Sequence, residues 1–421
     1  MSKIKLFGNT SSAHVAEHKP RKHGRGRRAL IVIAVILALL VGLYCLCVFS
    51  DIPFIAKWRT IYIQTAMDTM NHQWLATAFL PQSVIDEAMS QREGAMQEQT
   101  QHNSADDWAG NTESSSPPTS DSPSTSGGAI SEEDFYELFW ELDRDSMQAY
   151  LDEHPEALDN GWGNLYINEA GLNDNGTSIQ TTMGEQVLAI DVPNQILLVR
   201  APGTGSRGAL AVAKDPSRLS VKNSANLGES GQTAGQIAEA NGGVLAMTGS
   251  GFIDEGGVGN GGTLNGCAMS DGGGQGDHLG WSYKRVELRE DNYIYIVDAS
   301  SSVNPSTTDA VEFTPAIIVD GQRLNTWGWD SLNPRAVIGQ SDKGEILMLV
   351  VEGRLIDSLG ISVNECGEIL ERHNCMQAMN LDGGTSAILW YDGECVTRCS
   401  NPDLPEGRQL PNAFVYAGTR K

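Results

Sequence analysis

A long uncharged run near the amino terminus constrains the architecture of this chain more than any other feature. Residues 29–49 contain no charged side chain and are rich in Leu, Ile and Val. Such a run is long enough to cross a bilayer as a single helix. A cleaved signal peptide is the alternative, but this run is longer than a signal core and no small-x-small site follows it closely. We therefore predict a retained signal anchor.

The charges on the two sides of this run predict its orientation. Eight Lys and Arg precede it against a single acid, Glu17, whereas only Lys57 and Arg59 follow it before Arg92. By the positive-inside rule, residues 1–28 form a cytoplasmic basic tail and the remainder lies outside the cell. The predicted location is the cell membrane, with one span in contact with the lipid bilayer and an extracellular C-terminal domain.

The part of the chain beyond the basic tail is strongly acidic. The tail holds 8 of the 29 Lys and Arg and 1 of the 53 Asp and Glu, which leaves 21 basic and 52 acidic residues and a formal charge of −31. Nucleic-acid binding needs a basic surface, so this charge argues against a nucleic-acid partner. Acidic groups can collect divalent cations. We predict no cofactor, with a divalent cation requirement and the oligomeric state left open.

Five cysteines follow the apolar run. If the compartment outside the membrane is oxidising, two local disulfides are plausible. One joins Cys366 to Cys375, the other joins Cys395 to Cys399, and Cys267 is left without a partner.

Three segments of different composition precede the C-terminal domain. Residues 50–90 carry apolar side chains at roughly helical spacing, which predicts a juxtamembrane helical stalk. Residues 91–130 are dominated by Gln, Ser, Thr, Asp and Pro and cannot bury a core, which predicts a disordered linker. Ser131 and Asp134 resemble a helix start, so residues 131–158 are predicted to form an amphipathic helix.

Residues 160–421 contain many short apolar runs bounded by Gly, Asp, Asn or Pro, a pattern typical of strands. The run 346–351 is apolar without alternation, as expected for a strand covered on both faces. The clearest helices are 232–240 and 363–374. Together these features predict an α+β fold with a single mixed-sheet catalytic domain. The predicted strands are Val187–Ile190, Gln195–Val199, Ala209–Ala213, Tyr293–Val297, Ala316–Val319, Ala336–Ile338, Ile346–Val351, Met376–Leu381, Ala387–Tyr391 and Ala413–Tyr416.

Local rules predict how the strands in the last third of the chain are arranged. A turn signal at residues 341–344 lies between two apolar runs, which predicts a hairpin. Counting outward from the turn places Arg335 opposite Val350. The second hairpin strand ends at Glu352 and is followed by a helix and by a strand that ends at Asp382. The two strands that end in carboxylates should therefore run parallel through a right-handed crossover.

This arrangement brings Arg335, Glu352 and Asp382 to one sheet edge, where ligands of open α/β sheets tend to bind. The residues after Asp382 are two glycines and two hydroxyl residues, whose backbone can hold a polar or anionic ligand. A tight Asp-Gly turn between two strands is the alternative. An arginine suits a phosphate, and two carboxylates suit acid–base work on a glycosidic bond. An Arg–carboxylate pair that only closes the sheet edge is the other interpretation.

Three motifs stand out in this region: Asn333-Pro334-Arg335, Val351-Glu352-Gly353-Arg354 and Asn380-Leu381-Asp382-Gly383-Gly384. In order and spacing they resemble the phosphodiester glycosidase family. Its best-known member is the animal uncovering enzyme, N-acetylglucosamine-1-phosphodiester α-N-acetylglucosaminidase, and its bacterial members are often labelled exopolysaccharide-biosynthesis proteins. A weaker segment, Thr248-Gly249-Ser250-Gly251-Phe252, is similar to the family's upstream Asn-Gly-x-Phe and extends the resemblance to about residues 180–420.

The resemblance implies hydrolysis of a sugar-1-phosphodiester in cell-envelope or exopolysaccharide glycans. By position, Arg335 is expected to contact the phosphate and Asp382 to be the catalytic carboxylate, with Glu352 assisting. Three positions depart from the family pattern: Glu352 stands where Asp is usual, Thr248 where Asn is usual, and Thr385 where a third Gly is common. The expected substrate-binding residues are Asn333, Arg354, Asn380, Gly383, Gly384, Thr385, Ser386, Thr248 and Ser250.

Other interpretations stay open beside this one. The altered motif positions also fit a non-catalytic module that binds a glycan or a partner protein in envelope polysaccharide assembly. His278 is a candidate acid–base residue or ligand, but an exposed loop histidine is the simpler interpretation. Residues 254–257 are acidic and Gly-rich, yet their spacing fits no calcium loop and predicts a solvated turn.

Overall fold

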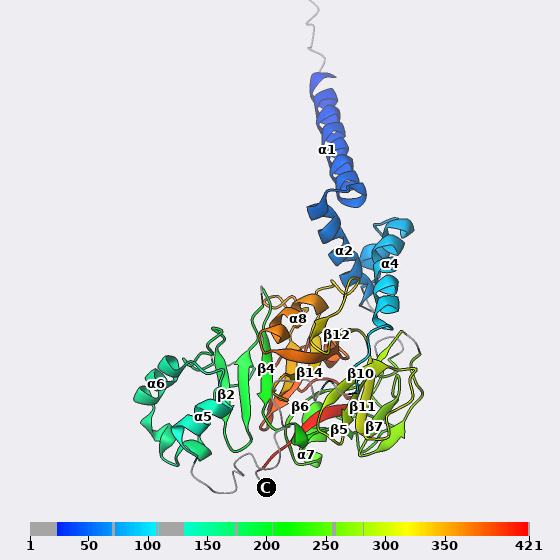
Figure 1. Ribbon diagram of the computed structural model, residues 1–421. Coiled ribbons are helices and arrows are strands. Elements are labelled where there is room, and N and C mark those ends of the chain that lie inside the picture. The colour runs from blue at the N-terminus through cyan, green and yellow to red at the C-terminus, as the bar shows by residue number, and fades with distance from the viewer. Residues whose placement is uncertain are drawn as a thin grey trace, which may run out of the picture. The chain divides into compact units, whose positions relative to one another are not determined.

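The computed structural model describes residues 23–69, 72–106, 108, 130–172, 176–203, 205–254, 258–280 and 282–419. It contains two compact units, residues 1–59 and 60–421, and each is described by itself (Figure 1). Most of the predicted basic tail and residues 109–129 of the predicted linker lie outside the described residues.

The first unit is dominated by one apolar helix, α1 (His23–Phe49). Its Arg27–Phe49 portion is long and apolar enough to cross a membrane by length and composition. A signal sequence near an amino terminus meets the same criteria. The end of α1 is hydrogen-bonded to the next helix: the Arg59 guanidinium donates to the carbonyl oxygens of Val48 and Ser50 at 3.0 Å each.

Three helices occupy the region for which one stalk helix was predicted: α2 (Pro53–Met67), α3 (Trp74–Thr77) and α4 (Gln82–Gln99). α4 continues past residue 91, where the disordered linker was predicted to begin, so that boundary was wrong. The buried side chain of Gln99 explains why the helix persists. Its amide donates to the Ala316 and Asn325 carbonyl oxygens at 3.1 and 2.9 Å and accepts from the Ala316 amide at 3.1 Å.

The chain after α4 also packs against strands of the second unit, to which it belongs. The Ser104 amide donates to the Ile296 carbonyl at 2.9 Å, and the Ile296 amide donates back to the Ser104 hydroxyl at 2.8 Å. Trp108 is buried edge-on against Tyr293 and Tyr295, with ring centroids 5.2 and 6.0 Å apart. Residues 60–106 are therefore part of the folded domain.

Two helices replace the single amphipathic helix predicted over residues 131–158: α5 (Glu132–Leu138) and α6 (Arg144–Glu153). The predicted helix start is confirmed, because Ser131 and Asp134 form a reciprocal capping box. The break lies between the helices, where Phe139 and Leu142 turn into the core and are almost fully buried. Short 3-10 turns follow at η2 (Pro155–Leu158) and η3 (Trp162–Asn164).

The α+β class is confirmed, but the strands form three sheets, and all their pairings in the described residues are antiparallel. The largest sheet has nine strands in the order β1-β2-β3-β4-β15-β14-β16-β12-β13. In Figure 1, α5 and α6 lie at the β2 end of this sheet. Its strands are β1 (Tyr166–Asn168), β2 (Val187–Asp191), β3 (Ile196–Arg200), β4 (Gly208–Ala213), β15 (Ile346–Val351), β14 (Arg335–Ser341), β16 (Cys375–Asn380), β12 (Ala316–Val319) and β13 (Gln322–Arg323).

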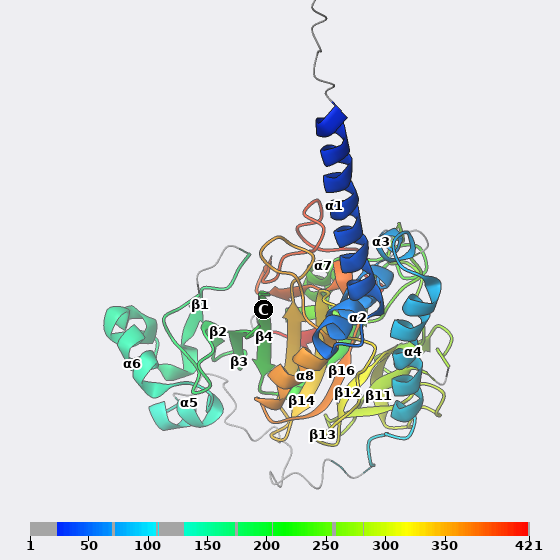
Figure 2. The same ribbon diagram turned by 90° about the horizontal axis from the view of Figure 1, so that it is seen from above.

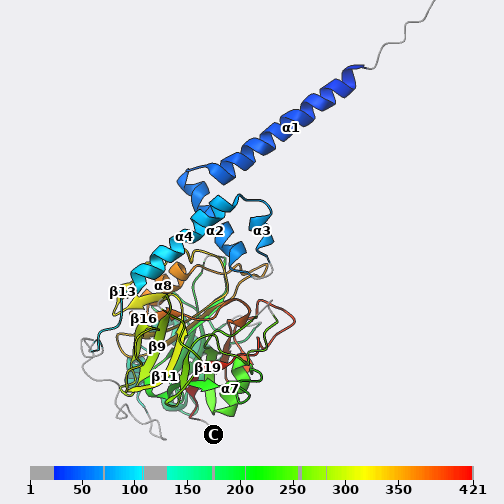
Figure 3. The ribbon, with the colours of Figure 1, turned by 90° about the vertical axis from the view of Figure 1, so that its right-hand side faces the viewer.

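Two five-stranded sheets complete the domain, in the orders β10-β9-β11-β7-β8 and β18-β17-β6-β19-β5. Figure 3 shows α7 (Ala234–Ala240) beside β19, on which it packs. The η4 turn (Pro216–Arg218) precedes β5. The strands are β10 (Ile294–Asp298), β9 (Lys284–Arg289), β11 (Thr307–Phe313), β7 (Ala268–Ser270), β8 (Gly273–Gln275), β18 (Glu394–Cys395), β17 (Leu389–Tyr391), β6 (Gly243–Thr248), β19 (Asn412–Ala417) and β5 (Leu219–Asn223).

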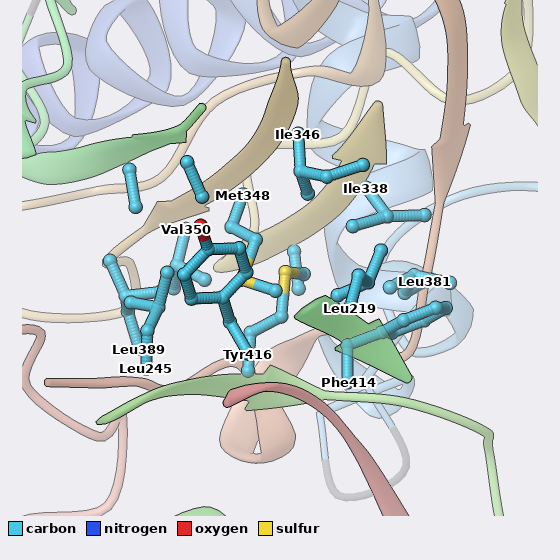
Figure 4. Close-up of a cluster of buried hydrophobic side chains, with 14 of the residues drawn as sticks. Leu219, Leu245, Ile338, Ile346, Met348, Val350, Leu381, Leu389, Phe414 and Tyr416 are labelled. Carbon is cyan, nitrogen blue, oxygen red and sulfur yellow. The ribbon is translucent and has the colours of Figure 1, made fainter. Parts of the chain in front are cut away.

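The strand β15 is buried on both faces, as its uninterrupted apolar run predicts. Ile346, Met348 and Val350 face a core shared with β5, β6 and β19, which Figure 4 shows in close-up. The residues between them face a second core shared with the helix α8 (Val363–Glu371), whose N-terminus is capped by Ser362. Figure 2 shows α8 beside β14 and β16, which it contacts.

The predicted hairpin exists as β14 and β15, but its register differs by one residue. Arg335 pairs with Val351 and not with Val350, because three residues, 342–344, form the turn and the Ser341 amide donates to the Glu345 carbonyl at 2.9 Å. The strands β15 and β16 run parallel, as predicted from the intervening helix, since both pair antiparallel with β14. They are not neighbours, because β14 lies between them.

The two predicted disulfides are wrong: Cys366, Cys375, Cys395 and Cys399 are all free thiols and buried, as is Cys267. The Cys375 thiol instead donates to the Gln377 carbonyl at 3.0 Å.

Candidate active site

A cavity of about 730 Å³ opens at the edge of the nine-stranded sheet where β14 begins and β16 ends. This volume is in the range of small-molecule sites in proteins. Its lining comes from distant parts of the sequence: residues 68–92, the segment 252–254, the loop 313–314, residues 329–335, Arg354, residues 380–386 and the segment 400–408.

Arg335 is the first residue of β14 and is 7% exposed. Its guanidinium donates to the Ser331 carbonyl at 2.8 Å, to the Ser331 hydroxyl at 2.9 Å and to the Ile361 carbonyl at 3.2 Å. All three acceptors are neutral, and no carboxylate of the described residues forms an ion pair with it. Burial lowers the pKa of Arg335. A buried cation without a counter-ion is costly, so this position favours an anionic ligand.

Arg354 is a second cation in the cavity. It adopts a left-handed backbone conformation with φ of 59°. Its guanidinium donates to the Asn333 side-chain oxygen at 3.1 and 2.8 Å, and no carboxylate of the described chain pairs with it. Burial lowers the pKa of Arg354, and the neighbouring charge of Arg335 lowers it further. A side chain at Gly384 would lie 3.1 Å from the Arg354 guanidinium, so this glycine gives the arginine room.

Asp382 lies two residues past the end of β16, on the cavity wall. Burial raises the pKa of Asp382 to about 6, an effect that a hydrogen bond from Ser386 and the charge of Arg408 partly oppose. A carboxyl group with this pKa exchanges its proton near neutral pH, which is the property required of a general base or acid.

The loop after Asp382 is pressed against the start of β14. The Gly384 amide donates to the Pro334 carbonyl at 3.0 Å, and a Cβ at Gly383 would approach that same oxygen to 2.7 Å. Asn380 is 3% exposed; its amide nitrogen donates to the Thr314 carbonyl, but its oxygen has no partner within the described chain. A buried acceptor on the cavity wall suits a hydroxyl donor such as that of a sugar.

Two ion pairs complete the charged lining, and sequence reasoning missed both. Arg408 binds Asp254 through two contacts of 2.5 and 2.9 Å, and this pairing lowers the pKa of Asp254. The same pair shows that Asp254 is a cavity residue, although a solvated turn was predicted there; residues 255–257 lie outside the described part. Arg92 binds Asp68 at 2.9 Å. No local pattern links these residues, because Arg408 and Asp254 are far apart in the sequence and Arg92 lies on α4 whereas Asp68 follows α2.

Most of the predicted site residues line the cavity together: Asn333, Arg335, Arg354, Asn380, Asp382, Gly383, Gly384, Thr385 and Ser386. Three predicted residues do not. The buried Glu352 carboxylate accepts from the Arg398 backbone amide at 2.9 Å and pairs with its guanidinium at 2.6 Å. Thr248 and Ser250 are buried on the β6 side, where Asn412 bonds to the Ser250 hydroxyl and amide.

One group of side chains in the described chain has the ligand types of a metal site. Atoms of Cys267, His278 and Glu312 lie within 4.8 Å of one another, and none of the three lines the cavity. Glu312 already accepts from the backbone amides of Cys267 and Leu279 at 3.1 and 2.9 Å and contacts His278 at 2.5 Å. His278 is thus a half-exposed loop residue bonded to a buried carboxylate.

The charges of the cavity divide into paired and unpaired groups. Arg92 with Asp68 and Arg408 with Asp254 are neutral pairs. The unpaired groups are two arginines, Arg335 and Arg354, and one carboxyl, Asp382, so the ionised site has a surplus of one positive charge. A phosphodiester carries one negative charge, which would balance this surplus. The arrangement can therefore hold a phosphodiester between two guanidinium groups with a proton-exchanging carboxyl beside it.

Comparison with known proteins supports this interpretation. Residues 234–417 match the family model described as phosphodiester glycosidase. The matched residues include the cavity segments from residue 252 onward. Among curated proteins, the SPbeta prophage-derived uncharacterized protein YomE of Bacillus subtilis (strain 168) is 26% identical over 110 residues. That match covers 25% of this chain and 17% of the relative, so it spans only a small part of that protein.

Solved structures with similar folds include the zebrafish N-acetylglucosamine-1-phosphodiester alpha-N-acetylglucosaminidase catalytic domain, described as auto-inhibited by its pro-peptide. That structure is 16% identical with a TM-score of 0.44, and the match covers 66% of this chain and 95% of that one. A hypothetical protein from Synechocystis is 12% identical with a TM-score of 0.39, covering 55% of this chain and 63% of its own.

Proposed function

This chain carries a domain of the phosphodiester glycosidase family in residues 234–417, and we propose that it hydrolyses the bond between a sugar and the phosphate of a sugar-1-phosphodiester. The observation that carries the proposal is a pair of arginines without a carboxylate partner among the described residues, the buried Arg335 and the more exposed Arg354, which line the same cavity as Asp382. Family membership supports a hydrolase that acts on phosphodiester glycans, and the charge balance of the cavity supports the phosphodiester as its substrate.

The proposed reaction breaks the carbon–oxygen bond at the anomeric carbon. The two arginines bind the phosphate, which leaves as a phosphomonoester on the acceptor. A water molecule supplies the new anomeric hydroxyl, and Asp382 accepts its proton and stabilises the positive charge that develops on the sugar ring. The phosphate is a good leaving group, so the reaction does not require a strong general acid.

We keep Asp382 as the catalytic carboxylate and no longer assign an assisting role to Glu352. Glu352 was predicted to assist Asp382, but its carboxylate is occupied by Arg398 and does not line the cavity. We propose that Asp382 is the essential carboxylate and that Glu352 supports the loop carrying Arg398. The unpartnered Asn380 oxygen is proposed to accept a hydroxyl hydrogen of the sugar.

The proposed setting is the outer face of the cell membrane, with residues 29–49 as the anchor and envelope or exopolysaccharide glycans as substrates. Protease added to intact cells should remove residues 160–421. Full protection of that domain would refute this orientation.

The activity is tested by incubating purified protein with a panel of sugar-1-phosphodiesters in ¹⁸O-labelled water. We expect release of a free sugar that carries the label, which identifies cleavage at the anomeric carbon. Label in the phosphate would instead show attack at phosphorus and contradict the proposed chemistry. Asp382→Asn should lose roughly a hundredfold or more in turnover, whereas the exposed Asp159→Asn should match the parent protein.

The second candidate function is a non-catalytic module that binds the same class of ligand. The same experiment separates the two, because saturable binding of a sugar-1-phosphodiester without turnover would favour the binding module.

A further inference from the structure

The segment that follows the apolar helix binds the loop leading into β14. The Gln64 side chain accepts the Asp330 amide at 2.9 Å, and the Thr65 hydroxyl accepts the Leu332 amide at 3.1 Å. Both contacts flank Ser331, so the C-terminal end of α2 fixes the backbone on either side of this one residue.

The Ser331 side chain is fully buried, and its hydrogen bonds have one consistent direction. A hydroxyl has one hydrogen to donate and two lone pairs to accept with. Ser331 donates to the Asp68 carboxylate at 2.6 Å. It accepts from the Arg335 guanidinium and from the Asn333 amide, both at 2.9 Å. Since a carboxylate can only accept, Asp68 forces the hydroxyl to donate toward it and leaves both lone pairs for Arg335 and Asn333.

The same network extends to the second arginine of the cavity. Because the Asn333 amide nitrogen donates to Ser331, its oxygen faces Arg354 and accepts from that guanidinium at 3.1 and 2.8 Å. Asp68 itself is held by Arg92 at 2.9 Å, and Arg92 also donates to the Gly328 carbonyl at 2.8 Å. Asp68 lies outside the family-matched residues, yet its carboxylate sets the direction of the hydrogen bonds that orient Arg335 and Arg354.

We propose that Asp68 is a positioning residue that orders Arg335 and Arg354 through Ser331 and Asn333. This inference rests on the proposed function, in which those two arginines bind the substrate phosphate. If so, the segment of residues 60–104, which contains Asp68, is needed for a functional site. A domain truncated to residues 131–421 would retain the two arginines but not their orientation. Asp68 acts through Ser331, so removing either residue should have the same effect.

The test compares Asp68→Ala and Ser331→Ala with the parent protein, with Asp86→Ala as the matched control. Asp86 lies on the exposed surface of α4 and, among the described residues, its side chain bonds only to Gln82, one turn away. Binding of inorganic phosphate is measured by calorimetry, and KM and kcat with a sugar-1-phosphodiester are measured separately. We expect both network variants to weaken phosphate binding and to raise KM about tenfold or more, with a smaller change in kcat. The control should be unchanged.

The outcomes separate this inference from the proposed function. If the parent protein binds phosphate and Asp68→Ala binds it equally well, the positioning role is overturned while the proposed function stands. If Asp68→Ala weakens binding but Ser331→Ala does not, Asp68 acts through its ion pair with Arg92 and not through Ser331, and the relay is overturned. If the parent protein neither binds phosphate nor cleaves the substrate, the proposed function fails. In that case, crystal structures of the parent and Asp68→Ala still decide the network, because unchanged Arg335 and Arg354 rotamers would overturn it.

Discussion

The two ends of strand β14 hold buried charges in opposite ways. Near Ser341, the Lys214 ammonium lies between Glu141 and Glu345 at 2.6 and 2.7 Å, and Ser341 donates to Glu345 at 2.9 Å. At the other end, the Arg335 guanidinium donates only to neutral oxygens of the described residues. The first arrangement neutralises its own charges, and the second leaves a cation without a counter-ion in the described part of the chain.

The comparison indicates how to separate structural from functional ionisable groups in this fold. Both ends are buried, so burial alone does not distinguish them. The presence or absence of an ion pair distinguishes the two ends. Although burial lowers the pKa of Lys214, the two glutamates outweigh it and raise that pKa, whereas the pKa of Arg335 is lowered by burial without a compensating ion pair.

The largest expected effect is on stability at the paired end. Lys214→Met leaves Glu141 and Glu345 buried without their cation, which should cost about 3–5 kcal/mol of the free energy of unfolding. Urea denaturation measures this loss. Lys222→Met, which breaks the more exposed pair with Asp271, is the control and should cost no more than about 1 kcal/mol. Equal losses in the two variants would remove the distinction between the ends of β14.

The next effect is on substrate binding at the unpaired end. Arg335→Ala removes a phosphate contact, so KM should rise by roughly ten- to a hundredfold while kcat changes less. Stability should change little, because no ion pair is broken and a desolvated cation is removed. Steady-state kinetics and urea denaturation of one preparation test both statements. A loss of stability as large as that of Lys214→Met would show that Arg335 is structural.

A smaller effect concerns the pH dependence of stability at Asp382. Its folded-state pKa of about 6 lies above the ordinary 3.8, so the folded protein holds this proton more tightly than the unfolded chain. Stability should therefore fall as pH rises between these two values, and the cost remains at higher pH. Asp382→Asn should raise the free energy of unfolding by roughly 1–3 kcal/mol at pH 7.5. The gain should shrink at pH 4, and an equal gain at both values would contradict the raised pKa.

The smallest effect is expected at Glu352. Glu352→Gln leaves the cavity lining intact, so turnover should stay within about threefold of the parent protein. The weakened bond to Arg398 should cost about 1–2 kcal/mol of stability. A hundredfold loss of turnover, with unchanged stability, would restore the catalytic role that sequence position suggested for this residue.

Local sequence patterns predicted the centre of the fold and most of one cavity wall. The uninterrupted apolar run of β15, the turn after Ser341 and the helix before β16 were sufficient to place Arg335 and Asp382 at one edge. The predictions failed where a residue's role depends on distant partners. The strands β9 and β11 were not recognised because their charged residues, such as Arg285 and Glu287, neutralise one another only after folding.

The rest of the site was not predictable from local patterns for the same physical reason. Arg408 and Asp68 reach the cavity from opposite ends of the chain, and no spacing relates them to the motifs around Asp382. The strand β6 was missed because its Leu, Ala and Met are as common in helices as in strands. Residues 91–106 were assigned to the linker because of their polar composition, yet polar side chains among them, such as that of Gln99, bond to the backbone of the domain.

The position of Arg335 on a strand enclosed by two others limits how the specificity of this protein can change. β14 is hydrogen-bonded along both edges, by β15 and by β16, so a shift of its first residue would disturb two ladders at once. The phosphate contact proposed for Arg335 is thus difficult to alter by small steps. Three other residues of the cavity lining, Ser400, Asn401 and Pro402, belong to a loop without such constraints. Directed evolution toward new sugars or acceptors should accumulate substitutions in that loop and leave the ends of β14 and β16 unchanged.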